Sequence, residues 1–372
     1  MKSGASKADL IFLAVTLVCC GALLLMPGPR PLARQSGTPV RARVLATDDS
    51  LLETHGLLRF GSQRLEVRIL EGEHRGEIFR AGNELRAQME LDKLFAPGDT
   101  AIVIVHESDR PGEAVLTAQD HDRSFWGILL AGSFCVLLCV FGSWTGAKAL
   151  FSFVFSCLVI WKAVIPLVLA GLPAGWTIFG AVALLTAVIV YLVAGVTRKG
   201  LAAFAGASSG VLAGLVLAHL FGRFMKINGA TMPYAQTLLY SGYENLNLQD
   251  LYIGAMMLAC SGAVMDLAMD IASAVEEVAR HNRQLPMREL VKSGLRVGRS
   301  VVGTMTTTLL LAYSGGYITL LMVFAAQGTS PWIFLNNPLV AAETVKTLIG
   351  SFSLVLVAPF TAWFAGFLFR PR

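Results

Sequence analysis

Eight stretches of about 20 mostly apolar residues dominate this chain of 372 residues. A helix of about 20 residues crosses the ~30 Å hydrocarbon core of a bilayer, because each residue adds about 1.5 Å. The chain is 55% hydrophobic and only 15% charged, which excludes an ordinary soluble domain. We therefore predict a polytopic α-helical membrane protein with eight transmembrane helices. The predicted spans lie near residues 8–26, 124–142, 150–171, 176–196, 201–221, 251–273, 301–326 and 347–369.

The distribution of basic residues predicts the orientation of these spans. With both termini in the cytoplasm, the inner segments carry 13 Lys and Arg residues and the short outer connections carry two. Cytoplasmic loops are enriched in Lys and Arg, so this orientation is favoured over its inverse. Residues 1–26 are predicted to remain as an N-terminal transmembrane anchor, since no small-residue cleavage site follows the apolar run. The alternative is a cleaved signal peptide, because Lys2 and Lys7 precede the apolar run.

Residues 27–123 form the one strongly polar part of the chain, and the orientation places them outside the cytoplasm. They hold 13 of the 30 Lys and Arg residues and 16 of the 25 Asp and Glu residues. Five short β-rich runs separated by turn sequences predict a small all-β barrel of OB or SH3-like type. Residues 84–95 between them suit either a short helix or a further strand and turn.

The composition of this barrel argues against binding nucleic acid. Its only aromatic residues are Phe60, Phe79 and Phe95, and acidic residues outnumber basic ones. Nucleic-acid binding needs stacking aromatic side chains and a basic face. We expect the barrel to dock an envelope protein partner or to cover the outer mouth of the membrane domain, residues 124–372.

Two carboxylates, Asp266 and Asp270, interrupt the predicted sixth span. Their i, i+4 spacing places both on one helix face, with Gly262 one turn earlier on roughly the same face. An ionised carboxylate near the centre of a membrane helix costs about 2.5–3.5 kcal/mol on insertion scales. We therefore predict that this pair, sheltered within the bundle, binds or relays a proton or cation. Lys162 is the expected counter-ion at similar depth, unless its long side chain extends to the membrane surface.

The predicted seventh span is unusually polar. Thr304 and Thr308 share one helix face, and Ser314, Gly315 and Gly316 interrupt the helix halfway along. Glycine breaks at this depth often line transport sites, so this span would complete the site around the aspartates. The alternative is a packed bend whose threonine hydroxyls bond to carbonyls of their own helix.

Three further patterns have structural interpretations. A stripe of small residues in the fifth span predicts close helix packing. Residues 286–299 combine an apolar with a basic face, which predicts a cytoplasmic amphipathic helix lying on the lipid bilayer. Glu343 and Lys346 are expected to form a local pair at a solvated helix end. The small residues of the stripe are Gly206, Gly210 and Gly214.

No sequence pattern indicates an enzyme, a metal site or a cofactor. The chain has no HExxH zinc motif, no G-x-S-x-G elbow and no phosphate-binding loop. The two aspartates share one helix, whereas intramembrane aspartic proteases need carboxylates on different helices that face each other.

Three segments of the chain resemble the YibE/F-like family of bacterial membrane proteins. They are GAVMDLAMDIASAVEEV (262–278), GTMTTTLLLAYSGG (303–316) and SFSLVLVAPFTAWF (351–364). The resemblance covers most of the chain, including the short exported β domain, and implies a multi-pass protein of the bacterial cytoplasmic (inner) membrane.

A second similarity is to the SecD/SecF branch of the RND-type transporters. There too an Asp-bearing span leads into an amphipathic helix and then a Thr-rich span, as in RELVKSGLRVGRSVVGTMTTTLL (288–310). This similarity implies that Asp266 or Asp270 couples transport to protons. The sequence therefore favours a transporter-like protein. The alternative is a non-transporting scaffold whose exported barrel recruits an envelope partner.

Overall fold

The computed structural model describes residues 7–26, 28, 37–107 and 114–371. The chain divides into two compact units: one is Ala33–Leu137, and the other combines Met1–Leu32 with Leu138–Arg372. We call the second the helical unit. The division differs from the predicted boundary after residue 123, because it lies inside a helix that begins at Ser124.

A closed barrel of five strands makes up most of the first unit. The strand order is β1-β2-β3-β5-β4, and β3 pairs with β5 in parallel while the other pairs are antiparallel. A small five-stranded barrel is therefore present, as the sequence predicts. Alternate residues point inward, and Val44, Val67 and Val103 are almost fully buried. The strands are β1 (Thr38–His55), β2 (Leu58–Ile69), β3 (Ile78–Arg86), β4 (Thr100–Glu107) and β5 (Ala114–His121).

A buried polar network holds the segment between β3 and β4 onto the barrel. Gln63, 1% exposed, accepts a hydrogen bond from the Phe95 backbone N–H at 3.0 Å and donates to the Phe95 carbonyl at 2.9 Å. The Asn83 side-chain amide donates to Gln63 Oε1 at 3.1 Å and to the backbone carbonyl of Lys93 at 2.7 Å. Residues 87–99 therefore lie against the barrel as turns, instead of the helix that one interpretation predicted.

Replacing Gln63 with Leu is expected to destabilise this segment by about 2–3 kcal/mol, because buried partners would be left without hydrogen bonds. Hydrogen exchange of the full-length protein should show faster exchange in the peptide around Phe95. The matched control is Gln88→Leu, an exposed glutamine in the same segment whose side chain makes no hydrogen bond to the described residues. Equal exchange in both variants would contradict the proposed role of Gln63.

Five helices of the described chain are long and apolar enough to cross a membrane. A sixth candidate combines α8 (Met287–Gly315) with α9 (Ile318–Ala326), which meet at a 67° bend. Shorter helices are α6 (Ala235–Tyr240) and α10 (Pro331–Asn336). The five are the helical run Ser124–Leu169, which is kinked at Ser143, and α4 (Ala174–Ala194), α5 (Arg198–Phe224), α7 (Leu248–His281) and α11 (Pro338–Phe369).

The prediction of eight spans is not confirmed, for two reasons. The predicted spans 124–142 and 150–171 fall in one kinked helical run, Ser124–Leu169, which counts as a single candidate span. This run comprises α2 (Ser124–Val159), η1 (Ile160–Val164) and α3 (Ile165–Leu169). Ser143, with φ 48° and ψ −128°, is non-helical and lies between the two predicted spans. The described apolar part of α1 (Lys7–Leu25) is Ala14–Leu25, which is shorter than a span.

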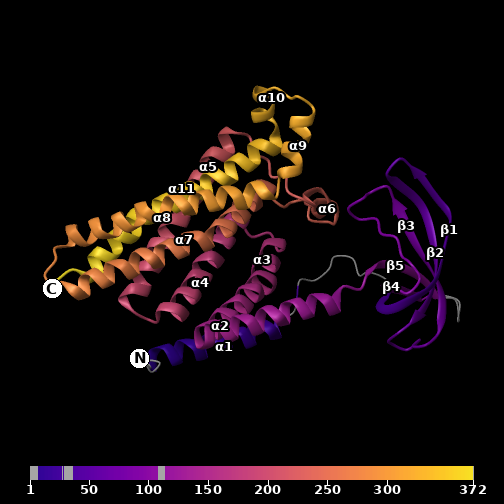
Figure 1. Cartoon of the computed structure of the whole chain (residues 1–372), viewed down its shortest axis with the longest axis horizontal. Helices are drawn as coiled ribbons and strands as arrows, with labels where there is room; N and C mark the ends of the chain where they lie inside the picture. Colours follow the sequence, from indigo (N-terminus) through magenta and orange to yellow (C-terminus); the bar gives the residue numbers. More distant parts are fainter. Residues whose placement is uncertain (1–6, 27, 29–36, 108–113, 372) are drawn as a thin grey trace. The chain divides into compact units, whose positions relative to one another are not determined.

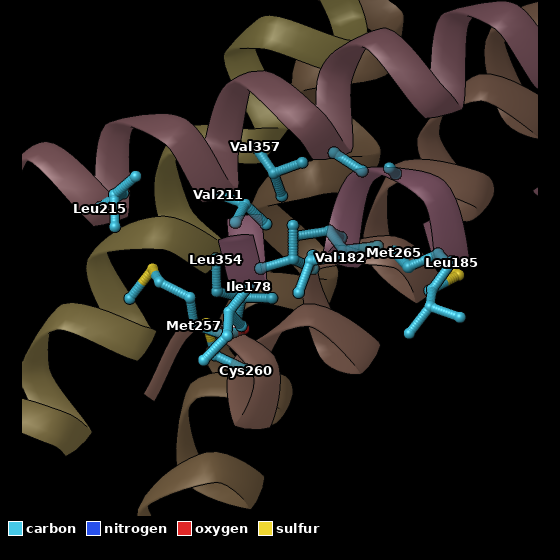
Figure 2. Close-up of a cluster of buried hydrophobic side chains, with 14 of the residues drawn as sticks. Ile178, Val182, Leu185, Val211, Leu215, Met257, Cys260, Met265, Leu354 and Val357 are labelled. Carbon is cyan, nitrogen blue, oxygen red and sulfur yellow. Dashed lines mark hydrogen bonds between the residues drawn. The ribbon is translucent and has the colours of Figure 1, made fainter. Parts of the chain in front are cut away.

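Helices α4, α5, α7 and α11 enclose the core of the helical unit (Figure 1). Figure 2 shows side chains from all four helices converging, including Val182, Val211, Met257 and Leu354. Each of these side chains is at most 2% exposed. Of the predicted polar residues, Asp266 and Asp270 lie on one of these four helices, α7.

The glycine stripe of α5 lies against α11. A Cβ at Gly206 would lie 2.7 Å from Thr361 Cα, and one at Gly210 would lie 2.9 Å from Val357 Cβ. A Cβ at Gly214 would clash with Ser353 Oγ. Glycine is needed at these positions because the two helix backbones approach closely.

Ion pairs link α5 and α7 at both ends. His219 Nε2 lies 3.4 Å from Asp250 Oδ1, and Lys199 Nζ lies 3.6 Å from Glu276 Oε2. Asp250 also accepts a hydrogen bond from the Gly175 N–H at the start of α4. His219 thus lies in a structural contact between α5 and α7.

The predicted amphipathic helix 286–299 is the first half of α8 and not a separate element. Its charged residues are exposed, as the sequence pattern indicates. Its apolar side packs on protein: Leu290 is 1% exposed, and Gly294 lies against Val275 and Ala362. This face was expected to lie on the lipid bilayer. It packs instead on α7 and α11, where Leu290, Val275 and Ala362 belong to the apolar core of the helical unit.

Candidate functional site

Asp266 and Asp270 lie near the middle of the 34-residue helix α7, on one face. Both side chains are exposed at the surface of the bundle, although the sequence predicted them to be sheltered within it. Within the described part of the chain, neither carboxylate makes a hydrogen bond or an ion pair. The buried face of α7 is occupied by large apolar side chains such as Met257, Leu267 and Ile271, which leave no room there for the aspartates.

Lys162 is not the counter-ion of the aspartates in this structure. Its Nζ donates a 2.7 Å hydrogen bond to the carbonyl oxygen of Met26, at the end of α1. Within the described part of the chain, no cationic side chain pairs with Asp266 or Asp270.

The threonine face of α8 follows the alternative interpretation. Thr304 and Thr308 are exposed, and their hydroxyls donate to Val301 O at 2.9 Å and Thr304 O at 3.0 Å in the same helix. Ser314 likewise donates to Leu310 O at 2.6 Å. These hydroxyls are therefore satisfied locally and do not converge on the aspartates.

The predicted glycine break is present, and it forms a sharp corner. Helix α8 ends at Gly315, Gly316 follows, and α9 begins at Ile318 after a 67° change of direction. Tyr313 and Tyr317 flank the break on its two sides. The corner therefore places two aromatic rings next to α11.

A charged pair that was expected at a solvated helix end lies against this corner. Lys346 Nζ donates to Glu343 Oε1 at 2.8 Å and lies 2.6 Å from Oε2. The two side chains are only 16% (Glu343) and 20% (Lys346) exposed. They are enclosed because α11 begins at Pro338, more than a turn earlier, and α7 and the corner flank it.

Three tyrosines surround this pair. Lys346 Nζ lies 5.2 Å from the ring centre of Tyr313 and 4.8 Å from that of Tyr317, within the range of cation–π attraction. The Tyr252 hydroxyl donates to Ala342 O and interacts electrostatically with Glu343. We call Glu343, Lys346, Tyr252, Tyr313 and Tyr317 the Glu–Lys–Tyr cluster.

Two cavities adjoin the cluster, and both are lined by Tyr317 and Glu343. One, of about 380 Å³, is also lined by Lys346, Tyr252 and residues 231–233 of the segment before α6. The other, of about 260 Å³, is mostly apolar and lies between the corner, α10 and α11. The cluster thus separates a more polar from an apolar space.

One face of α7 connects the cluster with the aspartates. Ala255 and Ala259 line the 380 Å³ cavity, and the spacing of Gly262, Asp266 and Asp270 keeps them on the same face. All five residues are exposed at the bundle surface. From Ala259 to Asp266 the helix rises about 10 Å. These small and acidic residues form a stripe, the α7 stripe, which is the candidate functional surface of the helix.

A family model for YibE/F-like proteins matches residues 130–371 of the chain. The chain belongs to the YibE/F-like family. No curated protein and no solved structure matches it. The match covers the helical unit from α2 onward, and together with the long apolar helices it identifies this YibE/F-like chain as a membrane protein. None of these comparisons shows the predicted similarity to SecD/SecF.

The enclosure of Glu343 and Lys346 was not predicted from the sequence of this YibE/F-like protein. A signal was present in the two tyrosines that flank the glycine break. Aromatic rings beside a helix corner in lipid suit a nearby cation, and Lys346 directly precedes the last predicted span. Thr306 was also missed: in the described structure its hydroxyl is buried without a hydrogen-bond partner.

Proposed function

We propose that this protein is an ion-coupled, transporter-like membrane protein in which Asp266 and Asp270 bind a proton or cation. The observation that carries the proposal is the position of two carboxylates, unpaired among the described residues, midway along an apolar helix. Carboxylates facing lipid are costly, and they persist where they meet water, a proton or a cation. Because like charges four residues apart repel, uptake of one positive charge by the pair is favoured.

The break between α8 and α9 supports the same function. Broken helices within a membrane bundle supply free backbone groups and a point of bending, both of which transporters use. The α7 stripe runs from the cavity next to this break to Asp266. A solute bound beside the break and an ion bound at Asp266 would thus share one helix face.

The topology belongs to the same proposal. We propose eight spans, with the helix Ser124–Leu169 crossing the membrane in two segments that meet near Ser143, and α1 as a further anchor. The excess of basic residues supports a topology with both termini in the cytoplasm and the β-barrel outside a bacterial inner membrane. The barrel would then face the envelope, where it can dock a protein partner.

Proton flux into proteoliposomes tests the function. Full-length protein with an internal pH-sensitive dye should conduct protons under an imposed pH gradient well above empty vesicles. Asp266→Asn and Asp270→Asn should each reduce this flux at least roughly tenfold, because the amide cannot release a proton. Glu277→Gln is the matched control, since Glu277 is an exposed carboxylate at the end of the same helix and its change should leave the flux intact.

Three outcomes would contradict the proposal. The first is wild-type flux no greater than that of empty vesicles under proton, sodium and potassium gradients. The second is full flux in both aspartate variants. The third is loss of membrane abundance in these variants, which would make the carboxylates structural.

A further inference from the structure

The Glu–Lys–Tyr cluster contains a buried hydroxyl without a hydrogen bond. Within the described residues, the Tyr313 hydroxyl has no hydrogen-bond partner. Both oxygens of Glu343 lie close to the ammonium of Lys346, Oε1 at 2.8 Å and Oε2 at 2.6 Å. Buried polar groups in folded proteins are nearly always satisfied, so each exception requires an explanation. The cluster therefore retains unused capacity to bind a further polar group.

The chemistry of the cluster is that of a cation site. A carboxylate and two aromatic rings are aimed at one ammonium group, which attracts cations both by charge and through the negative ring faces. Here that ammonium belongs to the protein itself, as Lys346. Its side chain comes from α11, one turn from Glu343, so it fills the site without closing the two adjoining cavities.

We propose that Glu343, Tyr313 and Tyr317 form a binding site for an organic ammonium ion, and that Lys346 occupies it as an internal substitute which the ligand displaces. A primary ammonium would donate to Glu343 Oε1 and Oε2 and lie against the two rings. The exchange conserves charge, because one cation leaves the carboxylate as another arrives. Lys346 would then turn into the 380 Å³ cavity that it already lines.

The apolar cavity argues for an organic ligand over an inorganic cation. Leu310, Leu321 and Phe334 line it, and Glu343 and Tyr317 form its polar edge. A ligand with its ammonium at Glu343 can place a small apolar group among these side chains. An inorganic ion would gain nothing from this space and would prefer a cage of oxygen atoms.

This site goes beyond the proposed proton or cation binding at Asp266 and Asp270. If the ammonium ligand is the transported solute, the inference rests on the proposed function, but the binding equilibrium itself does not. Binding can therefore succeed while proton flux fails, and the two proposals are tested separately.

Binding of phenethylammonium to the full-length protein in nanodiscs tests the proposal, with phenethyl alcohol as the neutral probe of equal shape. Lys346→Met removes the internal competitor and should tighten phenethylammonium binding at least roughly tenfold. The double variant Glu343→Gln with Lys346→Met has a neutral site of similar size. It should bind the ammonium no better than the alcohol.

Stability supplies a second measurement, because Lys346→Met leaves Glu343 without its partner. Phenethylammonium should raise the melting temperature of this variant, whereas phenethyl alcohol should not. If Lys346→Met does not fold, the wild type must still bind the ammonium at least tenfold more tightly than the double variant does.

The proposal is overturned if the double variant binds phenethylammonium as tightly as Lys346→Met. It is likewise overturned if phenethyl alcohol binds equally well, which would mean partition into an apolar cavity. Potassium binding as tightly as phenethylammonium would overturn the assignment to an organic ligand.

Discussion

Replacement of Glu343 with Ala is expected to destabilise the helical unit by about 3–5 kcal/mol, the usual cost of leaving a buried charge without its partner. The ammonium of Lys346 would keep its two tyrosine rings but lose the carboxylate that neutralises it. Scanning fluorimetry of the purified protein should show a fall in melting temperature of roughly 6–20 °C.

An exposed pair in the same protein provides the control. Glu289 and Lys292 have the same i, i+3 spacing and the same 2.8 Å hydrogen bond, but their side chains are 47% and 64% exposed. Glu289→Ala should therefore cost at most about 1 kcal/mol, as for other surface ion pairs. An equal loss of stability in both variants would show that burial does not make the Glu343–Lys346 pair more costly to break than an exposed pair.

The second large effect is expected at the contact between α5 and α11. Gly206→Val should destabilise the helical unit by roughly 3 kcal/mol or more, because even a Cβ at Gly206 would lie 2.7 Å from Thr361 Cα. The helices would have to separate, which would open the core that Val211 and Val357 fill between them. A lower melting temperature of the purified protein would report this separation.

Gly180→Val separates overpacking from the intrinsic helix preference of valine. Gly180 lies on α4, and a Cβ added to it would meet no described atom within 4 Å, yet the amino-acid change is the same. A melting temperature close to wild type is expected for this control. Equal losses in the two variants would show that the α5–α11 contact tolerates a side chain.

Several features of the fold follow from local patterns. The alternating runs of residues 27–123 predict a five-stranded barrel because strand periodicity and turn residues are local properties. The glycine break after Ser314 is also local, since glycine readily leaves the helical conformation. The angle of 67° at that break is not local, because it depends on how α9 packs after the turn.

The polar residues were harder to place. Asp266 and Asp270 were correctly expected on one helix face, since i, i+4 spacing determines that relation. The expectation that this face is sheltered was wrong, because helix geometry does not say which face the neighbouring helices cover. The partner of Lys162 could not be predicted either. It was expected to pair with the aspartates because it lies at a similar depth, but its ammonium donates to the carbonyl of Met26.

Composition and local patterns were enough to predict the class of protein, the existence of a β-barrel and the approximate positions of the apolar helices. These properties depend on composition and on periodicities of two and 3.6 residues, which require no knowledge of distant contacts. By contrast, the enclosure of Glu343 and Lys346 by tyrosines and the exposure of the aspartates follow from how the helices pack. Whether a side chain is buried depends on contacts between helices that are far apart in the chain, here on the close packing of α5, α7 and α11.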